Sequence, residues 1–466
     1  MLFGEGSSYL GLLMWIVLPS FLVLGLLIIP IGMIIRHRRD KRLSITYDAP
    51  WPRIDLNDVR VRNAAMIFGT GTIFFLLLSA VGSYEAFHYT ESVQFCGTTC
   101  HTVMKPEHVA YQNSAHARVA CVECHVGSGA SWYIRSKISG LYQVYAVLAG
   151  VYPKPIPTPV HNLRPARETC EECHWPEKFY ARQLVVEKHY LADEENTEWD
   201  ISLQMKTGPT YSALGLKEGI HWHINPDVKV EYIASDSIRQ SIPWVKYTNL
   251  KTGEEIVFED SENPLPEEQR AGMEVRTMDC MDCHNRPSHN YRPPFRFVND
   301  AITAGRISKE IPEVKMKAME ILNQDFPTTD SALAFIETEM HDYYSNYYED
   351  FYADNRHLID QAVETMKEEF QKNIFPEMNV KWSAYPNNIG HLEFIGCFRC
   401  HNDRHASESG RVISKDCNLC HSIVAQGVPD TLQVGSIHEE LEFVHPNDPY
   451  GDWKEYFCVE CHVDLY

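Results

Sequence analysis

Fourteen cysteines are the residues whose spacing points most directly to chemistry. All of them fall into seven groups in which the second Cys of a pair is followed at once by His. The first group, Cys96-Gly-Thr-Thr-Cys100-His101, has one extra residue. The six regular motifs consist of Cys121, Cys124 and His125; Cys170, Cys173 and His174; Cys280, Cys283 and His284; Cys397, Cys400 and His401; Cys417, Cys420 and His421; and Cys458, Cys461 and His462.

The spacing matches the covalent attachment of haem. Two thiols separated in this way add across the two vinyl groups of a haem, and the adjacent His then reaches the iron. Zinc sites and disulfide frameworks are the alternatives, but neither needs a His directly after every second Cys. The sequence therefore predicts seven covalently attached c-type haems.

A second ligand for each iron has to come from elsewhere in the chain. Seven of the 22 His belong to the motifs, which leaves fifteen. The candidates near a motif are His116, His161, His289, His391, His405, His438 and His445. His221 and His223, in the run HWHINP, lie farther from any motif, and each candidate has the alternative of being a solvated surface His. The supply is sufficient to close every iron, which favours electron relay over reduction of a substrate at an open iron.

Two apolar runs near the N-terminus are the first elements that must position these motifs. Tyr9 to Ile35 contains no charged residue, and a second apolar run covers roughly Ala64 to Tyr84. Each is long enough to cross a hydrocarbon core of about 30 Å. A cleaved signal peptide would need a basic segment before the first run, where the only charged side chain is Glu5. We expect two transmembrane helices, at about 9–35 and 64–84.

The loop between these runs predicts their orientation. Residues 36–63 contain four acidic and eight basic side chains, the latter being Arg36, Arg38, Arg39, Lys41, Arg42, Arg53, Arg60 and Arg62. Loops rich in Lys and Arg stay in the cytoplasm. We therefore expect a two-pass protein of the bacterial inner membrane with the bulk of its chain in the periplasm.

The stretch from Phe95 to about His174 resembles the NapC/NirT/NrfH family of membrane-anchored quinol dehydrogenases. The resemblance is carried by an apolar span that runs into the first motif, the run CGTTCHTVMKPE, and His116 before a second motif that is followed by Val126 and Gly127. The whole chain, with seven motifs and two spans, is similar to heptahaem inner-membrane cytochromes of anaerobic bacteria. The resemblance implies oxidation of menaquinol beside the first haem.

The resemblance also implies roles for particular residues. In the family a nearby Met often binds the first iron, which points to Met104, but the extra residue in this motif leaves either His101 or Met104 as the ligand. A Lys with an acidic partner handles the quinol protons, which points to Lys137. No acid lies between Glu123 and Glu168, so Glu107 is the substitute partner. The alternatives are a solvated surface acid for Glu107 and a lipid-headgroup contact for Lys137.

A basic and aromatic stretch supports a membrane-surface site independently of the resemblance. Residues 126–167 contain Arg and Lys but no acid, and aromatic and aliphatic side chains interleave with them from Trp132 to Leu148. In a chain with a formal net charge of −21, such a helix is typical of one that lies among lipid headgroups. The Pro-rich run 153–159 is expected to end it.

The predicted fold is mainly α with irregular haem-packed loops and a small β insertion. We expect a membrane anchor with a cytoplasmic basic loop at 1–88, a NapC/NirT-like haem domain with haems 1–3 at 89–184, a β-rich insertion at 185–275, and a C-terminal haem domain with a long helix and haems 4–7 at 276–466. The Tyr-rich run at 343–352 is expected to serve packing rather than electron transfer.

The expected function is oxidation of menaquinol and relay of its electrons. The expected partners are membrane lipid, the menaquinone pool, periplasmic cytochromes or a terminal reductase, with other membrane subunits as further candidates. The acidic balance argues against nucleic acid. The alternatives are an electron-wiring subunit of a larger respiratory complex, a periplasmic oxyanion reductase with one open haem, and the same path run in reverse.

Overall fold

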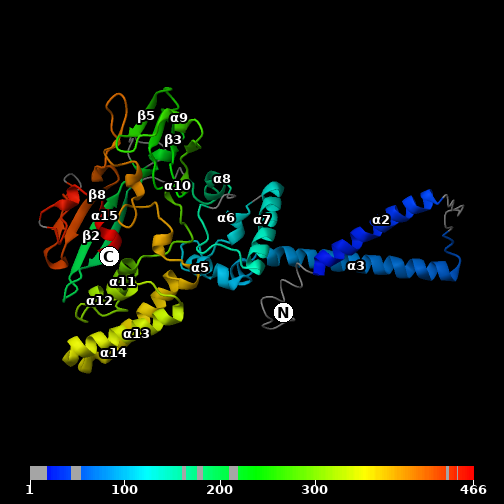
Figure 1. Ribbon diagram of the computed structural model, residues 1–466, viewed down its shortest axis with the longest axis horizontal. Helices are drawn as coiled ribbons and strands as arrows, with labels where there is room; N and C mark the ends of the chain where they lie inside the picture. The colour runs from blue at the N-terminus through cyan, green and yellow to red at the C-terminus, as the bar shows by residue number, and fades with distance from the viewer. Residues whose placement is uncertain are drawn as a thin grey trace. The chain divides into compact units, whose positions relative to one another are not determined.

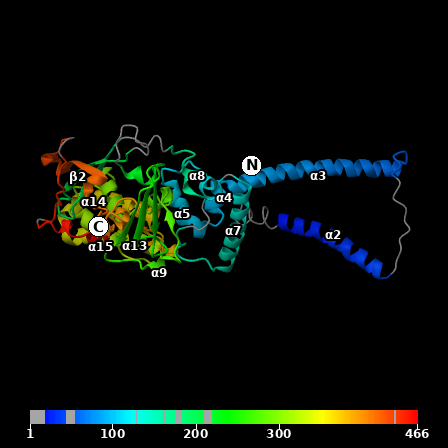
Figure 2. The same cartoon turned by 90° about the horizontal axis from the view of Figure 1, so that it is seen from above.

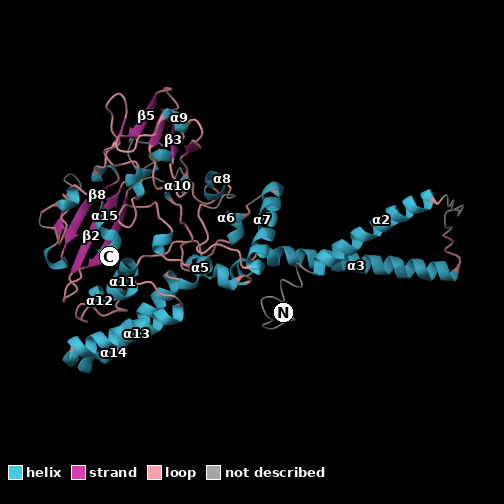
Figure 3. Ribbon diagram, in the orientation of Figure 1, coloured by secondary structure: helices cyan, strands magenta, loops and turns pink. Residues whose placement is uncertain are grey.

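The computed structural model describes residues 18–43, 54–127, 129–159, 164–175, 182–208, 219–436, 440–448 and 450–465. The chain forms two compact units, Met1–Lys105 with Ala120–Val122, and Pro106–Val119 with Glu123–Tyr466. The division between the units falls inside 89–184, the stretch expected to form one haem domain. Helices predominate over strands, and long loops join them (Figure 3).

The first unit contains α2 (Leu18–Arg42), α3 (Val59–Glu91), α4 (Val93–Thr98) and the beginning of α5 (His101–Gln112). α3 is one continuous rod in both views (Figures 1 and 2). Asp58 caps its N-terminus by accepting a hydrogen bond from the backbone N–H of Arg60 at 2.7 Å. Ser92 ends α3 and also begins α4, because its hydroxyl accepts from the backbone N–H of Phe95 at 3.0 Å. The helix α4, which carries Cys96 of the first motif, therefore follows α3 after a single capping residue.

Among the residues that the structure describes, one helix is long and apolar enough to cross a membrane. This helix is α3, with 33 residues and a mean hydropathy of 2.1 in its most apolar window. It contains the predicted span 64–84 and extends it at both ends. The other predicted span, 9–35, lies partly outside the described residues, and its described part belongs to α2, which ends in the basic run Arg39, Lys41 and Arg42.

The second unit holds short helices that carry motifs and longer helices that form a core. The short helices include α8 (Ala166–Cys170), α9 (Glu267–Arg270), α10 (Cys280–Cys283) and α15 (Cys458–Leu465), and also α6 (Cys121–His125) from Glu123 onward. The longer helices are α7 (Ala130–Ala149), α11 (Pro294–Thr303), α12 (Val314–Leu322), α13 (Thr329–Tyr347) and α14 (Glu349–Asn373). α7 ends at Gly150, whose left-handed backbone (φ 67°) forms the cap before the Pro-rich run begins.

Two antiparallel sheets complete the second unit. Their strands are β1 (Gln183–Tyr190), β2 (Glu198–Met205), β3 (Val228–Ile233), β4 (Trp244–Asn249), β5 (Glu255–Asp260), β6 (Arg276–Thr277), β7 (His405–Ala406), β8 (His421–Gly427) and β9 (Gln433–Val434). One sheet has the order β1-β2-β8-β9 and the other β6-β3-β4-β5-β7. The expected antiparallel strands at 185–275 are thus present.

These strands do not form a separate insertion, however. β8 pairs with β2 from Asp200 opposite Gly427 to Met205 opposite His421. β7 pairs with β5 and places Asp260 opposite His405. Both sheets therefore include strands from the last 70 residues, and β8 begins at the His of the sixth motif. The sheets act as a frame that fixes the C-terminal motifs.

A conventional hydrophobic core lies in α11–α14. Ile336, Met340 and Tyr344 of α13 are fully buried and pack with Ile359 and Phe370 of α14, and the two helices lie side by side (Figure 1). α13 begins with a reciprocal capping box between Thr328 and Ser331. The Tyr-rich run packs within this hairpin, where the ring centroids of Tyr343 and Tyr347 are 5.1 Å apart. This part of the second unit therefore has a core made of ordinary apolar side chains.

We predict that Met340→Ala lowers the free energy of unfolding by about 2–5 kcal/mol, because the truncation leaves a cavity in this core. Thr338→Ala, at an exposed position of the same helix, is the control and should change it by about 0.5 kcal/mol or less. Thermal unfolding followed by helical circular dichroism measures both. Equal shifts for the two variants would contradict the described packing.

Candidate functional site

The seven motifs lie on short helices or turns. All fourteen thiols are free of disulfide bonds. The regular motifs lie on α6, at the end of α8, on α10, on the 3-10 turns Gly396–Arg399 and Cys417–Leu419, and on α15. α10 shows why such a segment folds locally. Asp279 caps it by accepting from the backbone N–H of Met281 at 2.8 Å, and its own N–H donates to Asp282 at 2.7 Å.

Each His of the six regular motifs lies beside a second His ring from another part of the chain. The pairs, with their centroid distances, are His125 with His289 (6.2 Å), His174 with His116 (6.0 Å), His284 with His221 (6.3 Å), His401 with His223 (5.8 Å), His421 with His391 (6.2 Å) and His462 with His445 (5.9 Å). The six motif His and their six partner His all belong to the second unit.

This spacing fits a haem iron. An imidazole nitrogen binds a metal at about 2 Å, so two rings on opposite sides of one iron have centroids roughly 6 Å apart. A tetrahedral metal site would need more protein ligands, yet within the described ranges no group of three or more His, Cys, Asp or Glu side chains is arranged to hold a metal ion. Two His alone suit a metal whose other four ligands come from a porphyrin.

A buried arginine also fits a haem. Arg286 follows the fourth motif by two residues, and its Nε and Nη2 atoms are buried without a hydrogen-bond partner among the described residues. The guanidinium lies over the rings of Tyr385 and Tyr291, at 4.3 and 5.3 Å from their centroids. Haem propionates are carboxylates, and they would supply the acceptors that these two nitrogens lack.

Four of the candidates named from the sequence, His116, His289, His391 and His445, take part in the pairs. His221 and His223 lie far from any motif in the sequence and were therefore weaker candidates, but the structure places them beside the fourth and fifth motifs. They lie on the 3-10 helix Ile220–Ile224. The signal available in the sequence was the HWH run itself, because two His separated by one residue point in different directions and can serve two haems. Distance along the chain was the wrong criterion.

His405 has a different role from the one expected. Its side chain is completely buried, with Nδ1 at 2.9 Å from Asn402 Oδ1 and Nε2 at 2.7 Å from the carbonyl oxygen of Ile242. Both ring nitrogens are therefore engaged, and neither is left for an iron. As a structural residue, His405 joins the segment after the fifth motif to Ile242, which precedes β4, and to β5. His161 and His438 lie outside the described residues.

The first motif differs from the other six. Cys96 lies in α4, and His101 and Met104 both lie in α5. Which of the two is the ligand of the first iron stays a prediction.

Successive motifs are neighbours in space. Thiols of consecutive motifs lie within electrostatic reach of one another along the whole series. The pairs are Cys96 with Cys121, Cys124 with Cys170, Cys170 with Cys280, Cys283 with Cys397, Cys397 with Cys420, and Cys417 with Cys458. Within the second unit, from Cys124 of the second motif to Cys458 of the seventh, the order of the motifs in the sequence is therefore also the order in which their thiols are neighbours.

A buried polar network holds the fourth and fifth motifs together. Arg399, inside the fifth motif, donates to the carbonyl oxygens of Asp282, Gly396 and Arg239 at 2.8–2.9 Å. The Asp282 carboxylate, inside the fourth motif, accepts from the Tyr232 hydroxyl at 2.6 Å and from Arg276 Nε at 2.7 Å. Burial raises the pKa of the Tyr232 hydroxyl, and the adjacent Asp282 charge raises it further. Two attachment segments are thus fixed to each other by their internal residues.

The two residues expected to handle protons lie on α5 and α7. Lys137 Nζ is 4.9 Å from the centroid of the Tyr133 ring. Glu107 is not a solvated surface acid, because its side chain is only 16% exposed and its Oε2 lies 3.1 Å from His289 Nδ1. α7 itself carries a row of exposed apolar side chains at helical spacing, namely Ile134, Ile138, Leu141, Tyr145 and Leu148.

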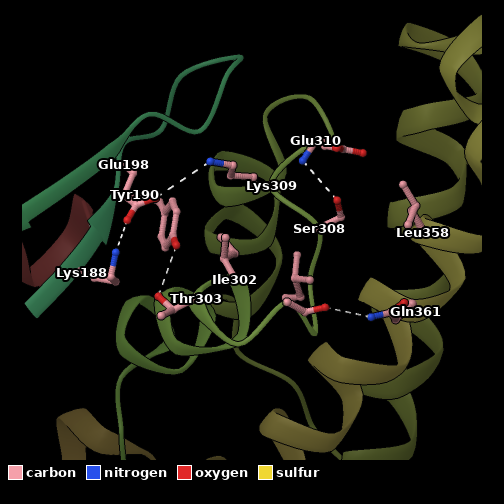
Figure 4. Close-up of a pocket in the computed structure, with 12 residues that line it drawn as sticks. Lys188, Tyr190, Glu198, Ile302, Thr303, Ser308, Lys309, Glu310, Leu358 and Gln361 are labelled. Atoms are coloured by element: carbon pink, nitrogen blue, oxygen red, sulfur yellow. Dashed lines mark hydrogen bonds and ion pairs between the residues drawn. The ribbon is translucent and has the colours of Figure 1, made fainter. Parts of the chain in front are cut away.

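A cavity of about 500 Å³ lies between β1, β2, the end of α11 and α14 (Figure 4). Lys188 and Glu198 form an ion pair at its edge, and the Tyr190 hydroxyl is 3.3 Å from the Thr303 hydroxyl. Its lining residues include neither a motif Cys nor a paired His. The cavity is therefore separate from the redox sites.

Seven attachment motifs, six of them with a second His beside the motif His, are typical of a multihaem c-type cytochrome. Residues 59–155 match the NapC/NirT cytochrome c family, N-terminal region. The chain is 44% identical over 464 residues to the cytochrome c-type protein ImcH of Geobacter sulfurreducens, which covers 99% of this chain and 90% of that protein. It is 30% identical over 117 residues to the cytochrome c-type protein NrfH of Wolinella succinogenes, covering 24% of this chain and 64% of that protein. No solved structure matches.

This chain belongs to the NapC/NirT cytochrome c family. The resemblance noted in the sequence is confirmed, as is the assignment to multihaem c-type cytochromes of electron transport. Membership of the family implies covalent haem with redox-active iron.

We predict that Arg399→Lys lowers the free energy of unfolding of the second unit by about 2 kcal/mol or more. Lys cannot donate to three separate carbonyls in a fixed plane, and a hydrogen bond from a charged group contributes about 1.5–3 kcal/mol. Arg411→Lys is the control, because the Arg411 side chain is exposed and forms an ion pair with Glu254, worth about 1 kcal/mol or less. Urea unfolding of the two haem-loaded variants tests this. A loss for Arg399→Lys no greater than that for the control would contradict it.

Proposed function

We propose that this protein is a heptahaem cytochrome of the bacterial inner membrane that oxidises menaquinol and passes electrons to periplasmic acceptors. The observation that carries the proposal is the series of six His pairs in which each motif adjoins the next. An iron with two axial His ligands has no open position for a substrate, and it is suited to electron transfer.

Each His pair is proposed to be the two axial ligands of one haem. In the order of haems 2 to 7, the second ligands are His289, His116, His221, His223, His391 and His445. The first haem has His101 or Met104. When bound, the haems supply one-electron redox chemistry. Backbone carbonyls hold some of these imidazoles in place: His221 Nδ1 lies 3.0 Å from the Thr207 carbonyl oxygen, and His223 Nδ1 lies 2.7 Å from that of Ile220.

The quinol site is proposed to lie at the membrane surface beside the first haem. α3 runs to Glu91, and the first thiol of the series follows five residues later at Cys96. Lys137 is proposed to take part in proton transfer from the quinol, since a Lys ammonium can exchange protons with a bound hydroxyl. The exposed apolar row of α7, together with the absence of acids at 126–167, supports contact of this helix with lipid.

The membrane arrangement is part of the same proposal. Residues 9–35 would form a second span that leads into the basic end of α2, and the loop 36–63 would remain in the cytoplasm. The haem-bearing part then lies in the periplasm, where periplasmic cytochromes, a terminal reductase or other membrane subunits would accept its electrons.

The alternative functions make different demands on the irons. An oxyanion reductase needs an open iron, and the six His pairs leave only the first motif to provide it. An electron-wiring subunit needs no quinol site, so the isolated chain would not react with quinol. Reversed flow would use the same site in the opposite direction.

We predict that the holo-protein carries seven covalent haems by mass and that His223→Ala leaves this number unchanged. The variant should convert one haem from low to high spin, because the fifth iron loses a ligand. His405→Gln is the control and should leave every haem low spin, since both ring nitrogens of His405 are engaged elsewhere. Electron paramagnetic resonance (EPR) distinguishes the two. A high-spin signal from the His405 variant, or none from the His223 variant, would refute the ligand assignment.

Lys137→Leu should slow reduction of the haems by a menaquinol analogue at least tenfold. The reason is that a positioned proton-transfer group typically increases a rate by a factor of about 10² or more. Reduction by dithionite should be unchanged. Arg135→Leu removes a positive charge at an exposed position of the same helix and should retain most of the rate. Stopped-flow absorbance measures both, and equal losses would assign the effect to general attraction for lipid headgroups.

A further inference from the structure

We infer that Glu107 is a positioning residue for the second haem. Glu107 holds His289 at Nδ1 and makes that imidazole a more electron-rich ligand. The inference rests on the proposed axial pair of His125 and His289. It assigns to Glu107 an action through His289 on the haem, in place of an action on quinol protons.

The contact is direct. His289 Nδ1 lies 3.1 Å from the Glu107 carboxylate oxygen Oε2 and 3.1 Å from the Glu107 backbone carbonyl oxygen. Both acceptors belong to one residue of α5, so the N–H of His289 is directed at Glu107 and its Nε2 is left for the iron. The two side chains are largely enclosed, at 29% exposure for His289 and 16% for Glu107, so solvent screens the contact only weakly.

Other paired histidines have a neutral partner at the same atom. His116, His221, His223 and His401 each place Nδ1 2.7–3.1 Å from a backbone carbonyl oxygen. A carbonyl fixes the ring, but a carboxylate also draws the Nδ1 proton toward itself and increases the basicity of Nε2. Greater electron donation stabilises the oxidised iron. The midpoint potential of the second haem is therefore lower than it would be with a neutral partner.

The charged groups near His289 are compatible with an effect of Glu107 on the basicity of the imidazole. Arg286 is the opposing positive charge within electrostatic reach of His289, and its guanidinium lies over the rings of Tyr291 and Tyr385. Both tyrosines also lie within electrostatic reach of Glu107. Because Cys96 and Cys121 are neighbours, the second haem is the next site after the first. Glu107 thus affects how readily the first haem passes an electron onward.

Glu107→Gln tests the inference in the full haem-loaded protein. Gln retains an oxygen that can accept from His289 but carries no charge, so the ring stays in place while its basicity falls. We expect one midpoint potential to shift upward in a spectroelectrochemical titration, and the EPR signal of one low-spin haem to change its g-values without becoming high spin. Glu123→Gln is the matched control, because it removes one charge from an exposed position on α6, inside the second motif.

The outcomes separate this inference from the proposed function. Unchanged potentials and g-values in Glu107→Gln, or an equal shift in Glu123→Gln, would overturn the role of Glu107. His289→Ala tests the ligand pair by itself, since one haem should become high spin. If His289→Ala gives a high-spin haem while Glu107→Gln changes nothing, only the role of Glu107 fails. If His289→Ala leaves all haems low spin, the ligand pair fails as well.

Discussion

The pairing of each regular motif His with a second His from a distant segment is the constraint on which much of this structure depends, and on the proposed function it is the means by which a haem iron would be held from both sides. A motif supplies two thiols and one His within a few residues, and it leaves the far side of the iron to another segment. His289 comes from the loop after the fourth motif to reach the second, and His116 precedes the second motif but reaches the third. One short turn, Ile220–Ile224, serves both the fourth and the fifth. Each pair therefore draws together segments that local structure would not connect.

The remaining elements stabilise the segments that form these His pairs. The sheets take strands from both the middle and the end of the chain, and β8 begins at the His of the sixth motif. A hydrogen bond from Arg399 to the carbonyl oxygen of Asp282 connects the fifth motif to the fourth. The helices α11–α14 add a core of ordinary side-chain packing, so haem is not the sole source of apolar mass. Rigid support suits electron transfer, because a site that hardly moves has little to reorganise when its charge changes.

What could be predicted from the sequence was local. The attachment motifs, α3 and the helical stretch 298–375 follow from spacing, apolarity and periodicity, each of which is contained in a short window. The partners of the motifs are not, since they meet through space. This is why His405, four residues from a motif His, was wrongly expected to be a ligand, while His221 and His223 were ranked too low. It is also why the strands of 185–275 looked like an insertion, although β7 and β8 complete their sheets.

The central claim is that quinol at the membrane surface delivers electrons to one continuous series of haems. The most direct test is to purify the haem-loaded protein in detergent, add a reduced menaquinol analogue, and follow the visible absorbance of the haems. The account predicts rapid reduction that extends beyond the first haem and is blocked by a quinol-site inhibitor. No reduction by quinol, in a sample whose haems are all reduced by dithionite, would contradict it.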